Sequence, residues 1–117
     1  MPEQTTIDRR VAKVVEIIDK GLARDLSVNA VACAVDLSQS YLAHIFKLET
    51  GVSIGAYVRN RRIAKAARLL IASSLSVKEI AAVVGFLQAQ HFTRAFTVAM
   101  GCSPTKYRIY ETRHPRK

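Results

Sequence analysis

Two short stretches of the chain carry the side chains with the most specific chemistry, and that chemistry is recognition rather than catalysis. The first stretch offers Gln39, Ser40, Ala43 and His44, and the second offers Gln88, Ala89, Gln90, His91 and Arg94. Glutamine can form two hydrogen bonds with an adenine edge, arginine can do the same with a guanine, and alanine or a small hydroxyl side chain can contact a thymine methyl group. We therefore expect both stretches to face the base edges of a nucleic acid. The alternative is that each is only the solvated face of a helix.

The sequence offers no arrangement that favours an enzyme. It contains no recognisable Ser, His and Asp arrangement, glycine-rich phosphate loop or pair of carboxylates within a plausible cleft. Cys33 and Cys102 are the only cysteines, and no CxxC or HxxxH spacing accompanies them. We expect both cysteines to be reduced and buried, and we expect no catalytic residues, metal or cofactor.

The charge balance favours a polyanionic partner. Eighteen Lys and Arg residues stand against nine Asp and Glu residues, which gives a net charge of +9 and a sequence pI near 10.1. Nucleic acid is the first expectation, although basic chains also arise for solubility or for binding acidic membranes. No apolar run approaches the ~18 residues of a membrane span, and residues 1–4 lack a signal-peptide layout. We therefore expect a cytoplasmic protein.

Several basic residues are candidates for contacts with phosphate groups. Those near expected helix starts could add a positive charge where free backbone N–H groups already favour an anion. Those on the expected long central helix point in different directions, since consecutive residues turn by about 100° around a helix, so only some of them can face one partner. The candidates are Lys47, Arg59, Arg62, Lys78, Lys106 and Arg108.

The spacing of apolar residues predicts an all-α fold of about seven helices with no strand. Apolar residues recur three and four positions apart, and capping residues mark the helix ends. Ser76 and Glu79 have the spacing of a capping box, and Ser103-Pro104 reads as a cap followed by proline at the first helical position. The expected helices start after a cap at Thr6 and run to about Leu22, then Val28–Val35, Gln39–Thr50, Ile54 to about Ala72, Val77–Val84, Gln88–Met100 and Pro104 to about Tyr110.

The chain also contains an internal repeat. Leu26-Ser27-Val28 matches Leu75-Ser76-Val77 at an offset of 49 residues, and after a turn the match continues at an offset of 50, from Leu42 and Phe92 to Tyr57 and Tyr107. Each copy is a capped short helix, a tight turn, a longer helix, a glycine and a further capped helix, which is typical of a helix-turn-helix unit. In such a unit the second helix enters the major groove of DNA.

The repeat suggests a division of the chain. We expect an N-terminal tail at 1–6, a first helix-turn-helix subdomain at 7–52, a connecting helix at 53–72, a second subdomain at 73–110 and a basic C-terminal tail at 111–117. A connecting helix of about nineteen residues would be a rod of nearly 28 Å, at roughly 1.5 Å per residue. Such a rod is compatible with two recognition helices about one DNA turn, ~34 Å, apart.

Three motifs resemble a known family. L-S-V-K-E-I-A-A-V-V-G-F, F-T-R-A-F and G-C-S-P-T-K-Y-R, in this order, resemble the signature of the AraC/XylS family of transcription regulators, and the similarity covers Ile7 to about Tyr110. The resemblance implies a DNA-binding domain of seven helices in two subdomains, whose readers would be Gln39–Thr50 and Gln88–Met100. It also implies double-stranded DNA and RNA polymerase as partners. The sequence departs from the usual pattern at Asp36, His44 and Thr97.

The sequence thus predicts sequence-specific binding of double-stranded DNA and regulation of transcription, with two recognition helices that read adjacent segments of the major groove. The alternative is a nonspecific architectural or RNA-binding helical protein, since charge supplies most of nonspecific affinity. In length the chain is similar to stand-alone members of the family, whereas most members also carry an N-terminal effector-binding or dimerisation domain. No site for a small-molecule effector is evident in the sequence.

Overall fold

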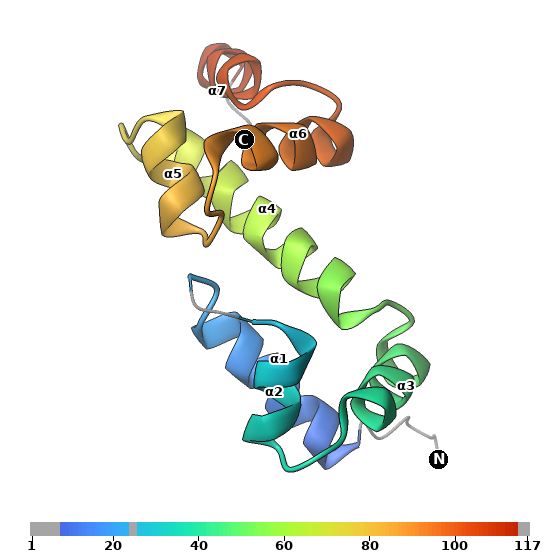
Figure 1. Cartoon of the computed structure of the whole chain (residues 1–117). Helices are drawn as coiled ribbons and strands as arrows, with labels where there is room; N and C mark the ends of the chain where they lie inside the picture. The colour runs from blue at the N-terminus through green and yellow to red at the C-terminus, as the bar shows by residue number, and fades with distance from the viewer. Residues whose placement is uncertain (1–7, 24–25, 115–117) are drawn as a thin grey trace. The chain divides into compact units, whose positions relative to one another are not determined.

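The computed structural model describes residues 8–23 and 26–114, and within these ranges it is entirely helical (Figure 1). This confirms the predicted all-α fold. None of the described helices is long and apolar enough to cross a membrane. The seven described helices are α1 (Arg9–Lys20), α2 (Val28–Ala34), α3 (Gln39–Thr50), α4 (Ile54–Ala72), α5 (Val77–Val83), α6 (Ala89–Met100) and α7 (Pro104–Arg113).

Serine side chains cap most of these helices at their N-termini. Each serine Oγ accepts a hydrogen bond from the backbone N–H three residues later, which satisfies one of the donors that a helix start leaves free. The predicted capping box of α5 is present, because the N–H of Ser76 also donates to Glu79 Oε1 at 2.8 Å. This bond holds the pKa of the Glu79 carboxyl below its ordinary value. The capping serines are Ser27, Ser38, Ser53, Ser76 and Ser103.

Several helix ends differ from the sequence prediction, most clearly the start of α1 and the end of α7. The first helix begins at Arg9 after an N-cap at Asp8, whose Oδ1 accepts the Arg10 N–H at 2.8 Å, so the prediction of a cap at Thr6 was wrong. Thr6 itself, and the pair at 24–25 that was expected to follow the first helix, lie outside the described residues. At the other end α7 continues three residues past Tyr110, and its last turn includes the buried Glu111.

The chain divides into two compact units, Met1–Val58 and Arg59–Lys117, and the division falls within α4. Each unit has its own apolar core. In unit 1 the ring of Phe46 packs edge-on against Tyr57, with centroids 5.6 Å apart at 75°, and in unit 2 Phe96 packs against Tyr107 at 5.4 Å and 75°. These two pairs stand at the predicted repeat offset of 50 residues. The repeat is therefore present in packing as well as in sequence.

The leading helices of the two units also correspond, a match that the sequence comparison missed. Val11, Val14 and Ile18 are the fully buried residues of α1, and the residues that α4 buries in unit 2 with the same spacing are Ile63, Ala66 and Leu70. This correspondence has an offset of 52 residues and different side chains, so it was hidden from a search for identical residues. The first turns of α4 pack in unit 1 through Ile54 and Val58. Hence α4 is the last helix of unit 1 and the first helix of unit 2.

Both turns inside the repeat use backbone that favours glycine or a small polar residue. Asp36 has φ of 57° and Gly85 has φ of 100°, so both have the positive φ that glycine and small polar residues adopt most readily. The prediction that both cysteine side chains are buried was wrong. The short helix α2 turns Val31 and Ala32 into the core, which leaves Cys33 exposed, and Cys102 is half-buried; both are free.

The end of α3 provides a test of the backbone assignment. Gly51 has φ of +83°, Gly55 lies in helical backbone near the start of α4, and a Cβ built on either would have no neighbour within 4 Å. Gly51→Ala should therefore lower the free energy of unfolding by about 1 kcal/mol through backbone strain alone. Gly55→Ala should raise it by up to about 0.5 kcal/mol through helix propensity.

Chemical denaturation of the two variants and the parent protein measures both effects. Because neither new methyl group meets another atom, packing cannot explain why one substitution lowers the free energy of unfolding and the other raises it. Equal stability of the two variants would mean that the left-handed cap of α3 is wrong.

Candidate nucleic-acid interface

The predicted base-facing residues of α3 lie on its outer face. Leu42 and Phe46 are fully buried on the inner face, whereas Ser40, Ala43 and His44 are exposed. Gln39 is exposed too, but its Nε2 donates a hydrogen bond to Asn29 Oδ1 on α2 at 3.1 Å. The outer face of α3 therefore presents a hydroxyl, a methyl group and an imidazole to a partner, while the Gln39 amide is engaged within the protein.

The outer face of α6 is richer in hydrogen-bonding groups. Gln90, His91 and Arg94 are exposed, and the helix is anchored from below by the fully buried Phe92 and Phe96. Of the remaining two predicted residues, Gln88 is the exposed N-cap residue and makes no side-chain cap bond, and Ala89 is half-buried against the core of unit 2. The face can thus offer an amide, an imidazole and a guanidinium from a helix whose orientation is held by two aromatic rings.

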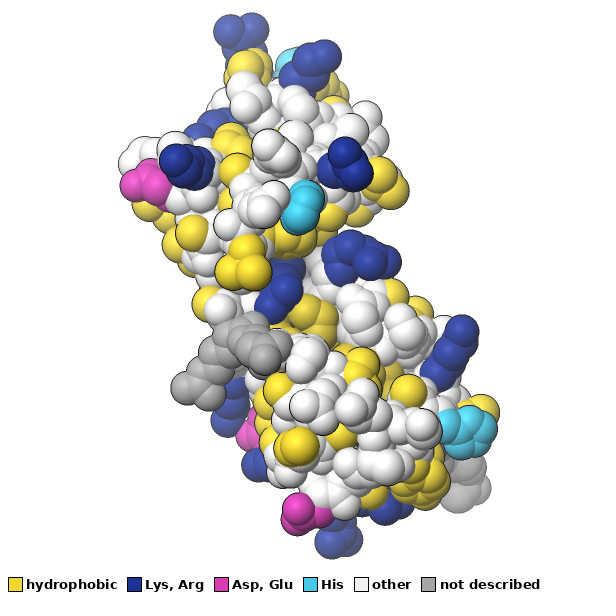
Figure 2. Space-filling view, viewed as in Figure 1, with side chains coloured by type: hydrophobic (Ala, Val, Ile, Leu, Met, Phe, Trp, Pro, Cys, Tyr) yellow, Lys and Arg dark blue, Asp and Glu magenta, His cyan; other side chains and the backbone are white. Residues whose placement is uncertain are grey.

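The candidate phosphate contacts fall into two groups. Most are exposed, while Arg62 and Arg108 are half-buried. On the face shown in Figure 2, Lys and Arg side chains are spread over both units and acidic side chains are few. This distribution suits a polyanionic partner. The exposed candidates are Lys47, Arg59, Lys78 and Lys106.

The Arg108 side chain is engaged inside unit 2. Its Nε donates to the Leu70 carbonyl at 2.8 Å, and its Nη2 donates to the carbonyls of Ser73 at 3.2 Å and Leu75 at 2.7 Å. These carbonyls belong to the last turn of α4 and the connection to α5, where a helix end leaves acceptors without partners. We therefore assign Arg108 to holding α7 against the end of α4, and we leave it out of the candidate interface.

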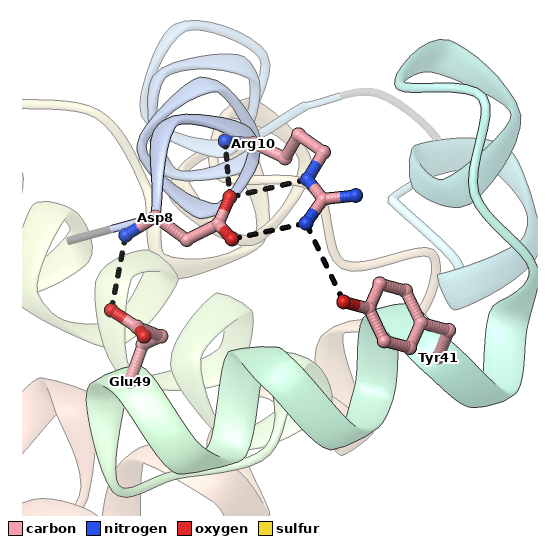
Figure 3. A network of polar contacts seen from close by, with 4 residues as sticks. All are labelled: Asp8, Arg10, Tyr41 and Glu49. Atoms are coloured by element: carbon pink, nitrogen blue, oxygen red, sulfur yellow. Dashed lines mark hydrogen bonds and ion pairs between the residues drawn. The ribbon is translucent and has the colours of Figure 1, made fainter.

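A polar network connects the start of α1 with α3 in unit 1 (Figure 3). The Arg10 guanidinium donates to both carboxyl oxygens of Asp8, at 3.2 and 3.1 Å, and to the Tyr41 hydroxyl at 3.5 Å. It also lies over the Tyr41 ring, 5.4 Å from the centroid. Glu49 Oε1 accepts the Asp8 N–H at 3.1 Å. The bonds from Arg10 hold the pKa of the Asp8 carboxyl below its ordinary value.

In unit 2 a groove of about 420 Å³ lies between α4 and α6. Arg59 and Asn60 line it from α4, and His91, Arg94 and Val98 line it from α6 together with Ala95 and Ala99. Arg59, His91 and Arg94 were among the predicted site residues, whereas the other lining residues were missed: Asn60, Ala95, Ala99 and Val98, whose side chain is 83% exposed. A signal for the groove was available, since α6 carries alanine at 95 and 99 where α3 carries the larger Ile45 and Glu49.

Comparisons with known proteins find relatives with helix-turn-helix domains. The helix-turn-helix domain family matches residues 31–109. The regulatory protein PocR of Salmonella typhimurium is 34% identical over 113 residues, which cover 95% of this chain and 37% of PocR. The transcriptional activator AarP of Providencia stuartii is 30% identical over 102 residues, which cover 87% of this chain and 76% of AarP. The chain spans about a third of the length of several curated relatives, PocR among them.

Solved structures with the same fold include two DNA-binding or regulatory domains. The C-terminal domain of AraT, a response regulator from Geobacillus stearothermophilus, is 34% identical with a TM-score of 0.88, and the match covers 91% of this chain and 88% of that domain. The DNA-binding domain of the transcription factor AdpA, solved with a target DNA, is 28% identical with a TM-score of 0.87, and the match covers 94% and 100%.

The Asp8 network predicts a pH dependence in unit 1. Since the folded-state pKa of Asp8 is lowered, its contribution is complete above the ordinary aspartate pKa of about 3.9 and is lost as the pH falls through the lowered value. The protection factors of the α1 amides, which are corrected for intrinsic exchange at each pH, should therefore fall more between pH 5 and pH 2 in the parent protein than in Asp8→Asn. Parallel curves for the two proteins would show that the network does not stabilise α1.

The Arg108 contacts predict a structural rather than a binding defect. Arg108→Lys keeps the charge but cannot reproduce the fork of donors, so the free energy of unfolding should fall by about 2 kcal/mol. Thermal denaturation measures this, with the exposed Lys106→Ala as a control that should melt like the parent protein. An Arg108→Lys variant of unchanged stability would contradict the structural assignment.

Proposed function

Because the chain belongs to the AraC/XylS family of helix-turn-helix transcription regulators, we propose that it regulates transcription by binding a specific double-stranded DNA sequence with two recognition helices, α3 and α6. The observation that carries the proposal is the outer face of α6, where Gln90 and Arg94 are exposed on a helix anchored by buried rings. An amide and a guanidinium presented by a firmly packed helix suit two-point recognition of adenine and guanine.

The two recognition helices contribute unequally in this proposal. Gln90 and Arg94 of α6 read base edges through hydrogen bonds. In α3 the exposed groups are smaller, so Ser40 and Ala43 contribute methyl and shape contacts, and His44 lies beside them. The selected DNA site should therefore show stronger base preference in the half that α6 reads than in the half that α3 reads.

Phosphate contacts supply the sequence-independent part of the affinity. Lys47 lies in the last turn of α3, and Lys78 and Lys106 lie in the first turns of α5 and α7. Side chains at helix starts stand beside free backbone N–H groups, which favours an anion there. Each phosphate contact should add about 0.9 to the slope of log affinity against log salt concentration. We propose that the two recognition helices read adjacent major-groove segments.

The test begins with selection of a binding site from random duplex DNA. The parent protein should enrich a single site and bind it about 10³-fold or more tightly than a scrambled duplex at the same salt concentration. Equal binding to the selected duplex, the scrambled duplex and a duplex RNA would contradict this proposal and favour a nonspecific architectural or RNA-binding protein.

Two substitutions separate base reading from phosphate binding. Arg94→Ala should cost about 1 to 3 kcal/mol on the selected site and relax preference at one base position. Lys106→Ala should weaken binding to the selected and scrambled duplexes alike, and it should reduce the slope of log affinity against log salt concentration by about one unit. Both residues are exposed, so the variants should melt like the parent protein. If Arg94→Ala leaves the base preference intact, α6 does not read the DNA in this orientation.

A further inference from the structure

The residues of unit 1 that correspond to the lining of the unit 2 groove are larger, and several of them contact one another. With the offset of 50 between α3 and α6, Tyr41, Ile45 and Glu49 correspond to His91, Ala95 and Ala99. With the offset of 52 between α1 and α4, Asp8 corresponds to Asn60. In unit 1 these positions bridge the two helices directly, because Glu49 accepts the Asp8 N–H and Tyr41 contacts Arg10, which is paired with Asp8 (Figure 3). In unit 2, Ala95 and Ala99 of α6 stand where α3 has the larger Ile45 and Glu49, and a groove lies there.

The two places also differ in charge. Unit 1 brings two carboxylates, from Asp8 and Glu49, to the contact between its helices. No lining residue of the unit 2 groove is acidic, and Arg59 and Arg94 stand at it. Within the described part of the chain neither of these guanidinium groups has an ion-pair partner. The groove is therefore electropositive, with an uncharged amide at Asn60.

The position of the groove identifies an occupant. His91 and Arg94, which belong to the proposed base-reading face, also line the groove, so a partner that fills it must lie directly beside the DNA bases. The nearest anionic part of DNA is its own phosphate backbone. The apolar wall of Ala95, Ala99 and Val98 suits the deoxyribose between two phosphates, while the guanidinium of Arg59 suits the phosphate itself.

We propose that the groove between α4 and α6 is a phosphodiester site that receives one DNA strand beside the bases read by α6, and that unit 1 lacks such a site because its own side chains fill the equivalent space. This inference rests on the proposed function and adds Asn60, Ala99 and Val98 to the DNA contacts. It predicts that unit 2 carries more of the phosphate-dependent affinity than unit 1.

Substitutions that copy unit 1 into unit 2 test the site. Asn60→Asp introduces the charge of Asp8 without a change in size, and Ala99→Glu introduces the side chain of Glu49. Ala99→Gln is the matched control, since it has the same size as Ala99→Glu but no charge. Both substituted positions, 60 and 99, are exposed, and thermal melting verifies that the three variants remain folded.

Affinity is then measured for the selected and scrambled duplexes between 50 and 200 mM salt. Asn60→Asp and Ala99→Glu should weaken binding to both duplexes by a similar factor and reduce the salt slope by about one unit. The loss of affinity between 50 and 200 mM salt should then be about fourfold smaller than for the parent protein. Ala99→Gln should weaken binding less and leave the slope nearly unchanged. The ratio of selected to scrambled affinity should stay within about twofold of the parent value in all three variants, because backbone contacts carry no base information.

A second measurement locates the phosphate. Neutral methylphosphonate linkages are placed one at a time in the selected duplex. One of them should weaken binding by the parent protein without further weakening binding by the Arg59→Ala variant. If no linkage behaves in this way and Ala99→Glu binds like the parent protein, the groove does not hold the DNA strand. That result leaves the proposed function intact as long as Arg94→Ala still loses base preference. Failure of the parent protein to select any site would instead overturn the proposed function itself.

Discussion

The structure depends on the burial of one aromatic ring in each unit, Phe46 in α3 and Phe96 in α6. Both side chains are fully buried, and each packs edge-on against a tyrosine of the following helix. Removal of such a ring from a core typically costs about 3 to 5 kcal/mol, a large part of the stability of a domain of this size. Because the ring fixes which side of the helix faces inward, it also fixes which residues face outward. In α6 the burial of Phe92 and Phe96 defines the inner face of the helix, and this determines which side chains lie on its outer face.

Local signals were sufficient for most of the fold. Serine caps, terminal glycines and apolar spacing predicted α3 and α4 at their observed ends, since each signal acts within a few residues of the helix end that it defines. The start of α1 was missed because Thr6 and Asp8 are both capping residue types. Asp8 is also tied to Arg10 and to Glu49, which lies 41 residues away. A contact at that separation leaves no mark in a local pattern.

The candidate site was likewise predictable where it depends on local helical periodicity and not where it depends on contacts between distant parts of the chain. The exposure of Gln90 and Arg94 follows from helical periodicity and is confirmed, whereas their contact with bases stays a prediction. Arg108 looked like an exposed basic residue near a helix start, but its partners are carbonyls 33 to 38 residues earlier in the chain. The groove was missed although α6 carries alanines at 95 and 99, because its lining also depends on which residues of α4 lie against them, about 35 positions earlier in the chain.

The shared helix α4 also has a consequence for the order of events during synthesis of the chain. The first turn of a helix is the unfavourable step in its formation, and later residues add at little cost. Unit 1 emerges first, and its core includes Ile54 and Val58 at the start of α4. Once unit 1 has folded, the costly first turns of α4 are already in place when Ile63, Ala66 and Leu70 become available. Unit 2 then folds on a helix whose first turns have already formed as part of unit 1.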